Sequence, residues 1–269
     1  MKKLILYIVL VIGALAFIYP FYWMVMASLA PESEIGALTL LPSSFTFNSY
    51  LQMFEKIPIG RAFFNSIFVA TIVTSGVLVL CSMVGYALSR LRFAGRNLIF
   101  YVIIFTMTLP FQITLIPNYI IMVKLGWIDT YFALIIPYLI NAFAIIMFRQ
   151  AFQTIPQDLI DAARIDGCGE LRIIFQILWP NIVPSLVTVG IITFMATWNE
   201  VLWPLIVIRD ESLMTMPQLV TLFSVGGRAE SQLGVKLASA TILAIPIIVA
   251  YLFFQKYFIQ SMASAGMKE

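Results

Sequence analysis

The chain alternates between long apolar runs and short segments that carry its charges. Stretches long enough to cross about 30 Å of hydrocarbon occur six times, and all are free of charge except for Glu200 in the fifth. They cover residues 4–29, 62–89, 97–122, 130–148, 182–207 and 237–255. This pattern predicts an all-α integral membrane protein with six transmembrane helices, built as a single transmembrane domain over residues 1–269.

Composition supports a membrane protein. Of the 269 residues, 61% are hydrophobic and 11% are charged, whereas soluble domains carry about 25% charged residues. The chain has no histidine, which removes the usual proton shuttle and the commonest metal ligand. Cys81 lies in an apolar run and Cys168 in a polar loop, so neither a disulfide framework nor a metal site is expected. The net charge of +3 is too small to indicate nucleic-acid binding.

The first apolar run follows Lys2 and Lys3 and superficially resembles a signal peptide. The hydrophobic region of a signal peptide is about 7–15 residues long, and this run is much longer. Ser28 and Ala30 have the small-x-small spacing of a cleavage site, which keeps that alternative open. The length of the run favours an uncleaved first helix.

Positive charge orients the predicted helices, because cytoplasmic loops carry an excess of Lys and Arg. With a cytoplasmic N-terminus, the inside segments hold ten basic residues and the outside segments six. The ten are Lys2, Lys3, Arg90, Arg92, Arg96, Arg149, Arg164, Arg172, Lys256 and Lys268; the six are Lys56, Arg61, Lys124, Arg209, Arg228 and Lys236. Both termini are therefore expected in the cytoplasm.

Three loops are too long to be simple turns. Residues 30–61 and 208–236 lie outside, and about 150–180 lie inside, between the fourth and fifth spans. Long loops on a compact scaffold tend to carry function, so partner proteins are expected to touch these three. The outer loop 208–236 contains the Gly226-Gly227 pair. Its sequence fits a solvated connector as well as it fits a surface that contacts a partner protein.

The inner loop reads as a helix, a glycine turn and a second helix. Pro156 suits the first turn of a helix, and Asp158 and Asp161 complement the positive end of its dipole. The apolar face is predicted from Leu159, Ile160, Ala163 and Ile165. Gly167 and Gly169 end this helix, and a second amphipathic segment runs to Pro180.

A short helix with one apolar face is not stable alone. It must pack on its own bundle, on the membrane surface, or in the groove of a partner.

The motif Asp161-Ala162-Ala163-x-x-Asp166-Gly167, followed by Ile177-x-x-Pro180, resembles the EAA loop of bacterial ABC importer permeases. One departure is that Asp161 stands where that loop begins with Glu. The resemblance covers essentially the whole chain and extends to Phe64-Asn65-Ser66, Trp198-Asn199-Glu200 and the tail Gln255-Lys256-Tyr257-Phe258. It points to the carbohydrate-uptake branch, similar to the second, six-helix permease of the maltose importer.

The resemblance implies a bacterial inner-membrane subunit that pairs with a second permease. A cytoplasmic ABC ATPase dimer would sit below it and an extracytoplasmic solute-binding protein above it. The implied ATPase-coupling residues are Asp161, Ala162, Ala163, Asp166, Gly167, Ile177 and Pro180. The chain has no G-x-x-x-x-G-K-[ST] phosphate loop, so it is expected not to be an enzyme and to bind no cofactor, with ATP and Mg on the partner ATPase.

Polar groups in the apolar runs are candidates for the translocation path: Asn65, Gln112, Trp198, Asn199 and Glu200. An ionisable group at membrane depth is by default functional. Glu200 lies about 18 residues into its run, at ~1.5 Å per residue, which also places it near the outer interface, where Trp198 and Trp203 suit an aromatic belt. Glu200 thus either lines the path or holds a helix end. Asn65 and Gln112 equally suit hydrogen bonds between helices.

Other functions compete with sugar import. An importer permease for another solute, such as glycerol phosphate, is the nearest alternative. An ion-driven secondary transporter would usually show repeated halves and buried charges, and neither is evident here. A membrane scaffold that recruits an unrelated cytoplasmic protein is the third alternative.

Overall fold

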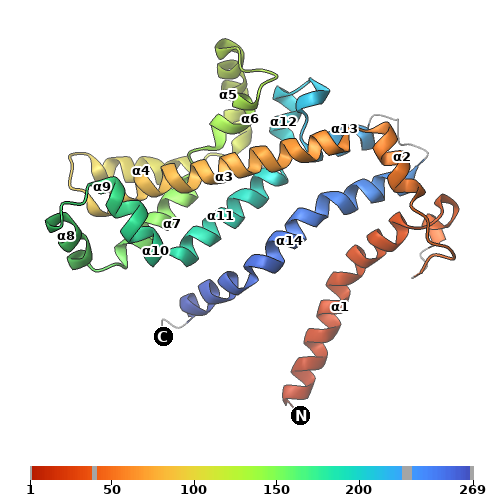
Figure 1. The fold of residues 1–269 in the computed structure, drawn as a ribbon, viewed down its shortest axis with the longest axis horizontal. Helices are drawn as coiled ribbons and strands as arrows, with labels where there is room; N and C mark the ends of the chain where they lie inside the picture. The colour runs from red at the N-terminus through yellow and green to blue at the C-terminus, as the bar shows by residue number, and fades with distance from the viewer. Residues whose placement is uncertain (1, 38–40, 226–231, 267–269) are drawn as a thin grey trace. The chain divides into compact units, whose positions relative to one another are not determined.

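The computed structural model describes residues 2–37, 41–225 and 232–266. These residues are almost entirely helical and contain no strand (Figure 1). They divide into two compact units, described separately here: residues up to Phe63 with 215–248, and residues 64–214 with the chain from Val249 onward.

Among the residues that the structure describes, three uninterrupted helices are long and apolar enough to cross a membrane. The spans are Lys3–Ser28 in α1 (Lys2–Ser28), Ile59–Arg90, which is the whole of α3, and Leu233–Phe253 in α14 (Leu233–Gly266). Three further candidate spans are helix pairs bent at a short break, which gives six when each pair counts as one span. The membrane class and helical fold predicted from hydropathy are thus confirmed.

The third predicted span, 97–122, is in fact a sharply broken one. α4 (Arg96–Thr106) and α5 (Phe111–Leu125) meet at 103°, and Pro110 directly precedes α5. A proline has no backbone N–H and disfavours helical geometry in the residue before it, so a break is expected at this point. The fourth span bends by 43° between α6 (Tyr131–Ile135), its 3₁₀ continuation η2 (Ile136–Tyr138), and α7 (Ala142–Gln153).

The fifth span differs from its predicted boundaries, 182–207. α11 (Val183–Trp198) ends before Asn199, and α12 (Leu202–Val207) is a separate short helix. The apolar helix bent against α11, at 93°, is instead the segment Glu170–Asn181 from the inner loop. Hydropathy averages across such breaks, because the residues on either side of a break are as apolar as the helix itself.

The first unit is organised around the start of α14. Its core joins Ala27, Ala30 and Ile35 to Trp23 and Leu237. The connecting loop forms a 3₁₀ turn, η1 (Glu32–Ala37), and the helix α2 (Asn48–Lys56), and the unit also contains α13 (Met216–Val225).

A carboxylate from η1 caps α14. The Glu32 carboxylate accepts hydrogen bonds from the backbone N–H groups of Leu233 and Gly234, the latter at 3.0 Å. A negative group is favourable at a helix N-terminus. A β-carbon at position 234 would lie 2.4 Å from Ser49 Oγ and 2.7 Å from Glu32 Oε2, so a larger residue there would displace these side chains and disturb the cap.

The second unit holds the main hydrophobic core. α3 contributes Val69, Val73, Val77 and Cys81, spaced by four so that they share one face. Facing residues include Phe148 and Phe152 of α7, Val189 of α11 and Trp203 of α12. Gly85 allows α3 and α7 to approach closely, because a β-carbon at this position would lie 2.8 Å from Cβ of Phe148.

Candidate coupling loop and translocation path

The first loop helix, α8 (Gln157–Ile165), begins directly after Pro156. Pro156 is the residue before the helix, in extended geometry (φ −56°, ψ 139°), rather than part of its first turn as the sequence suggested. Asp158 lies in the first turn, where its charge complements the helix dipole as predicted.

α8 ends in a Schellman turn centred on Gly167. The Cys168 N–H donates to the Ala163 carbonyl (2.9 Å), and the Gly167 N–H donates to the Arg164 carbonyl (3.0 Å). Gly167 has a φ of +78°, in the left-handed region that glycine adopts without strain. A β-carbon at Gly167 would meet nothing within 4 Å, so the requirement for glycine comes from the backbone and not from space.

The apolar residues of α8 are divided between two surroundings. Ile160 and Ala163 are buried in the core of the second unit, whereas Leu159 is 39% exposed and Ile165 is 86% exposed. The single apolar face predicted from the sequence is therefore wrong, because at about 100° per residue Ile165 lies on the side of the helix away from Ile160. α8 packs on its own bundle and still presents an isoleucine outward.

The second half of the loop is a continuous but irregular helix. α9 (Glu170–Arg172) leads into a π-helical turn (Ile173–Leu178) and α10 (Trp179–Asn181). The indole N–H of Trp179 donates to Ser82 Oγ of α3 at 3.2 Å, which fixes the segment to the bundle. Ile177 is half-buried and Pro180 is exposed.

The remaining predicted coupling residues lie on the surface of the loop: Asp161, Ala162, Asp166 and Gly167 are all exposed. Two ion pairs join this surface, Arg164 with Asp161 (3.6 Å) and Arg164 with Glu170 (3.1 Å). Burial lowers the pKa of the Arg164 guanidinium, but Tyr86 and Glu170 outweigh this and raise it, so the charge is secure. The sequence did not identify Tyr86 or Glu170 as partners of Arg164. The one available signal was that an acidic residue, Glu170, follows the Gly167 turn closely.

Asn65, a predicted path residue, is fully buried in the second unit, with its amide engaged by the protein itself. Its Nδ2 donates to the carbonyls of Ser212 and Met214, both at 3.0 Å, and its Oδ1 accepts from the Tyr131 hydroxyl at 2.7 Å. Asn65 thus ties α3 to the start of the long outer loop. A role in the translocation path stays a prediction.

The tryptophans near the break of the fifth span are not an interfacial belt. Trp198 is 1% exposed, and Trp203 is fully buried with its indole N–H donating to the Ala133 carbonyl at 2.8 Å. Glu200 holds a helix end, as one of its two interpretations required: its Oε1 accepts from the Trp203 N–H at 3.2 Å, at the start of α12. Asn199 is exposed, and its amide donates to the Met195 carbonyl at 2.9 Å.

The remaining path candidate, Gln112, is exposed in the first turn of α5. Within the described ranges, no three His, Cys, Asp or Glu side chains gather as ligands for a metal. The residues Gly226 and Gly227 of the outer loop lie outside the described residues.

Asp129, in the turn before α6, is a further anchor of the outer loop. Its Oδ1 accepts from the Asp210 N–H (2.9 Å) and the Arg209 N–H, while its own N–H donates to the Val207 carbonyl (3.0 Å). Its φ is +56°, a conformation that aspartate tolerates better than most residues. The start of the outer loop is therefore fixed from the turn before α6 as well as from Asn65.

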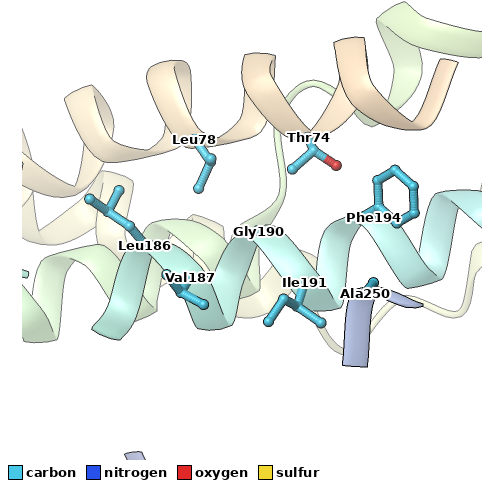
Figure 2. A pocket seen from close by; sticks show the side chains of 8 residues that line it. All are labelled: Thr74, Leu78, Leu186, Val187, Gly190, Ile191, Phe194 and Ala250. Carbon is cyan, nitrogen blue, oxygen red and sulfur yellow. The ribbon is translucent and has the colours of Figure 1, made fainter. Parts of the chain in front are cut away.

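A cavity of about 400 Å³ lies between α3 and α11 (Figure 2). Its lining is almost wholly apolar: Thr74, Leu78, Leu186, Val187, Gly190, Ile191, Phe194 and Ala250. The Thr74 hydroxyl is buried there without a hydrogen-bond partner in the described part of the chain. A sugar site needs several convergent polar groups, so this cavity is not a candidate sugar site.

Comparison with known proteins defines the class of the chain. The family described as "binding-protein-dependent transport system inner membrane component" matches residues 82–264. The arabinooligosaccharides transport system permease protein AraQ of Halalkalibacterium halodurans is 34% identical over 93% of this chain and 91% of its own. The sn-glycerol-3-phosphate transport system permease protein UgpE of Pectobacterium atrosepticum is 28% identical over 96% and 95%.

A solved structure supports the same class of protein. The crystal structure of a bacterial ABC transporter involved in the import of the acidic polysaccharide alginate contains a chain that matches with a TM-score of 0.83, at 27% identity, over 96% of both chains. The chain therefore belongs to the family of inner-membrane components of binding-protein-dependent transport systems. It is a permease subunit of an ABC importer, as the EAA-like loop indicated.

Proposed function

We propose that this permease forms half of the translocation path for a neutral oligosaccharide and couples to a separate ATPase through the segment Asp161–Gly167. The observation that carries the coupling half is the arrangement of α8. Ile160 and Ala163 hold the helix on the bundle, while Ile165 stands 86% exposed beside exposed Asp161 and Asp166. An apolar side chain presented on a short anchored helix suits recognition in the groove of a partner.

ATP binding would close the two ATPase subunits, and the docked α8 would follow them. Because α8 is fixed by buried contacts to the core of the second unit, its displacement reaches the membrane helices as a rigid-body movement. ATP and Mg belong to the ATPase in this scheme, and the permease binds no cofactor of its own. The two compact units act together as one permease domain.

The partners follow from the same scheme: a second permease, an ATPase dimer, an extracytoplasmic solute-binding protein and membrane lipid, with no nucleic acid. The excess of basic residues in the inner segments supports a cytoplasmic location for both termini. The outer-loop segment that follows α12 is held by Asn65 and Asp129, which gives a solute-binding protein a fixed surface to meet.

The charge of the candidate path favours a neutral solute over a phosphate ester. Its members Asn65, Gln112, Trp198 and Asn199 are uncharged, and the neighbouring Glu200, which caps α12, is acidic. Recognition of phosphate normally uses Arg, Lys or helix N-termini, and an acidic group nearby opposes it. The similarity to AraQ, whose name specifies arabinooligosaccharides, points to the same class. Glycerol phosphate, named in UgpE, is the second candidate.

Reconstitution tests this proposal. The chain, its second permease, the ATPase and the binding protein are placed in proteoliposomes, and uptake of labelled neutral oligosaccharides and of glycerol 3-phosphate is followed with ATP or a non-hydrolysable analogue. The proposal requires oligosaccharide uptake that depends on ATP hydrolysis. Uptake of glycerol phosphate alone would overturn the solute class, and uptake driven by an ion gradient without ATP would overturn the importer mechanism.

A further inference from the structure

Two residues one helical turn apart at the C-terminal end of α3, Tyr86 and Arg90, both reach the coupling loop. α8 and α9 lie at this end of α3 in the second unit (Figure 1). Residues four apart on a helix project from the same face, so both side chains leave α3 on the side of the loop; they are called the Tyr86 arm and the Arg90 arm below. Each arm contacts a different part of the loop.

The Arg90 arm holds the entry to α8. Its guanidinium donates to the carbonyl of Phe152 (3.2 Å from Nε) and to the carbonyl of Ile155, which lie at and just beyond the end of α7. Carbonyls at a helix C-terminus have no partner within the helix, so a cation is well placed there. A further donor, Nη1, reaches Oε1 of Gln157, the first residue of α8, at 3.0 Å.

The contacts continue along the exposed side of α8. Gln157 Nε2 donates to Asp161 Oδ1 at 3.0 Å, and the same oxygen lies 3.6 Å from Arg164 Nη1. Arg164 then donates from Nε to Glu170 Oε1 of α9 at 3.1 Å, across the Gly167 turn. The coupling residue Asp161 is therefore one member of a continuous series of polar contacts.

Tyr86 joins the far end of this series of polar contacts, at Glu170, to α3. The Tyr86 hydroxyl donates to the Glu170 carboxylate and accepts from Arg164 Nη2 at 3.3 Å. Tyr86 is 1% exposed, and its ring packs edge-on against Phe152. The resulting closed polar circuit consists of Arg90, Gln157, Asp161, Arg164, Glu170 and Tyr86.

Isolated ion pairs at a surface contribute little, and Arg164 with Asp161 or Glu170 would be of this kind. The circuit differs because both of its ends are anchored on α3, one of them through a buried hydroxyl hydrogen-bonded to a carboxylate. The contacts of Ile160 and Ala163 hold α8 on the bundle but are non-directional, so they resist separation better than sliding. Hydrogen bonds are directional and resist sliding.

We propose that Tyr86 and Arg90 are positioning residues that make α8, α9 and α3 move as one body, so that displacement of the loop by the ATPase is transmitted to α3. The transmission of movement rests on the proposed function, because it needs the ATPase. The rigidity of the loop does not depend on the proposed function. The two parts are tested separately, with Tyr86→Phe as the main variant and Tyr101→Phe as its control, which removes a hydroxyl from an exposed tyrosine on α4.

Hydrogen–deuterium exchange on the full chain in nanodiscs tests rigidity without any partner. Tyr86→Phe should raise amide exchange over residues 157–168 by about tenfold or more, since about tenfold is the lower end for losing one hydrogen bond to a charged group. Tyr101→Phe should leave it unchanged. Equal exchange in Tyr86→Phe and the unsubstituted chain would overturn the circuit as a constraint.

The assembled transporter tests transmission. With the ATPase retained at wild-type affinity, Tyr86→Phe should lower the solute taken up per ATP hydrolysed by several-fold. Glu170→Gln, which keeps an acceptor oxygen for Tyr86, should lower it less than Glu170→Ala. Wild-type uptake per ATP in Tyr86→Phe, or parallel loss of ATPase binding in every variant, would overturn the proposal. Failure of the unsubstituted chain to assemble with any ATPase would instead overturn the proposed function, while the exchange experiment still decides the rigidity of the loop.

Discussion

Replacing Gly167 by alanine isolates the backbone requirement of the turn between α8 and α9. Gly167 has a φ of +78°, and a β-carbon there would meet nothing within 4 Å, so the substitution adds strain without a clash. For a residue other than glycine, this conformation costs about 1–2 kcal/mol of free energy. This corresponds to a roughly 5- to 30-fold smaller equilibrium ratio of the native turn to its alternatives.

The apparent affinity for a partner falls with the population of the form that binds it. Binding of the purified ATPase to the permease complex in nanodiscs should therefore weaken in Gly167→Ala, with roughly 5- to 30-fold as the upper limit, reached when the native turn is only marginally populated. Gly167→Asn should lose less, because asparagine adopts the left-handed region more readily. The size of the added side chain matters less than the presence of a β-carbon, since the space around Gly167 is open.

Gly126→Ala is the matched control. Gly126 has a φ of +68° and equally open space, but it ends α5, away from the inner loop. Its substitution pays the same backbone penalty and should leave ATPase affinity unchanged. Wild-type affinity in Gly167→Ala, or an equal loss in Gly126→Ala, would refute the argument that the Gly167 turn shapes the docking surface.

Three further substitutions test other parts of the structure. Asn65→Ala removes three buried hydrogen bonds and should lower the free energy of unfolding by about 2–3 kcal/mol, seen as a lower melting temperature by tryptophan fluorescence; an unchanged melting temperature would contradict the anchoring role. Gly85→Ala forces a β-carbon to 2.8 Å from that of Phe148 and should cost about 1–3 kcal/mol, whereas Gly60→Ala, in open space on the same helix, should cost far less in the same assay. The Ser43 hydroxyl and N–H donate to the half-buried Glu34 carboxylate and lower its pKa below the ordinary value of 4.5. Stability that Glu34 adds over Glu34→Gln at neutral pH should therefore be lost as the pH falls through the lowered pKa, and a stability difference independent of pH would contradict this.

Much of the fold was accessible from the sequence because the bilayer imposes a strong constraint. A charge-free run of about 20 residues has few alternatives to a membrane helix, and helical runs were found at each predicted position. The third span breaks at Pro110, a residue type that cannot continue a helix. The break after Trp198 was missed because the backbone leaves the helix among residues that are still mostly apolar.

The coupling loop was predictable in its sequence motif but not in its attachments. Gly167 was identified as a turn glycine because few other residues fit such a turn, and the structure places it in the left-handed region. The polar circuit joins α3 to a loop about 80 residues away in the chain, and Tyr86 carries no local sign of its partner Glu170. Contacts of this kind follow from packing, which no local pattern encodes.

The most direct test of the account is to purify the tagged chain from bacterial membranes in mild detergent and identify what accompanies it. The account predicts that an ABC ATPase and a second permease co-purify with the unsubstituted chain, and that Gly167→Ala retains the second permease but recovers less of the ATPase. Recovery of the unsubstituted chain without an ATPase, in cells that express the partner subunits, would contradict it.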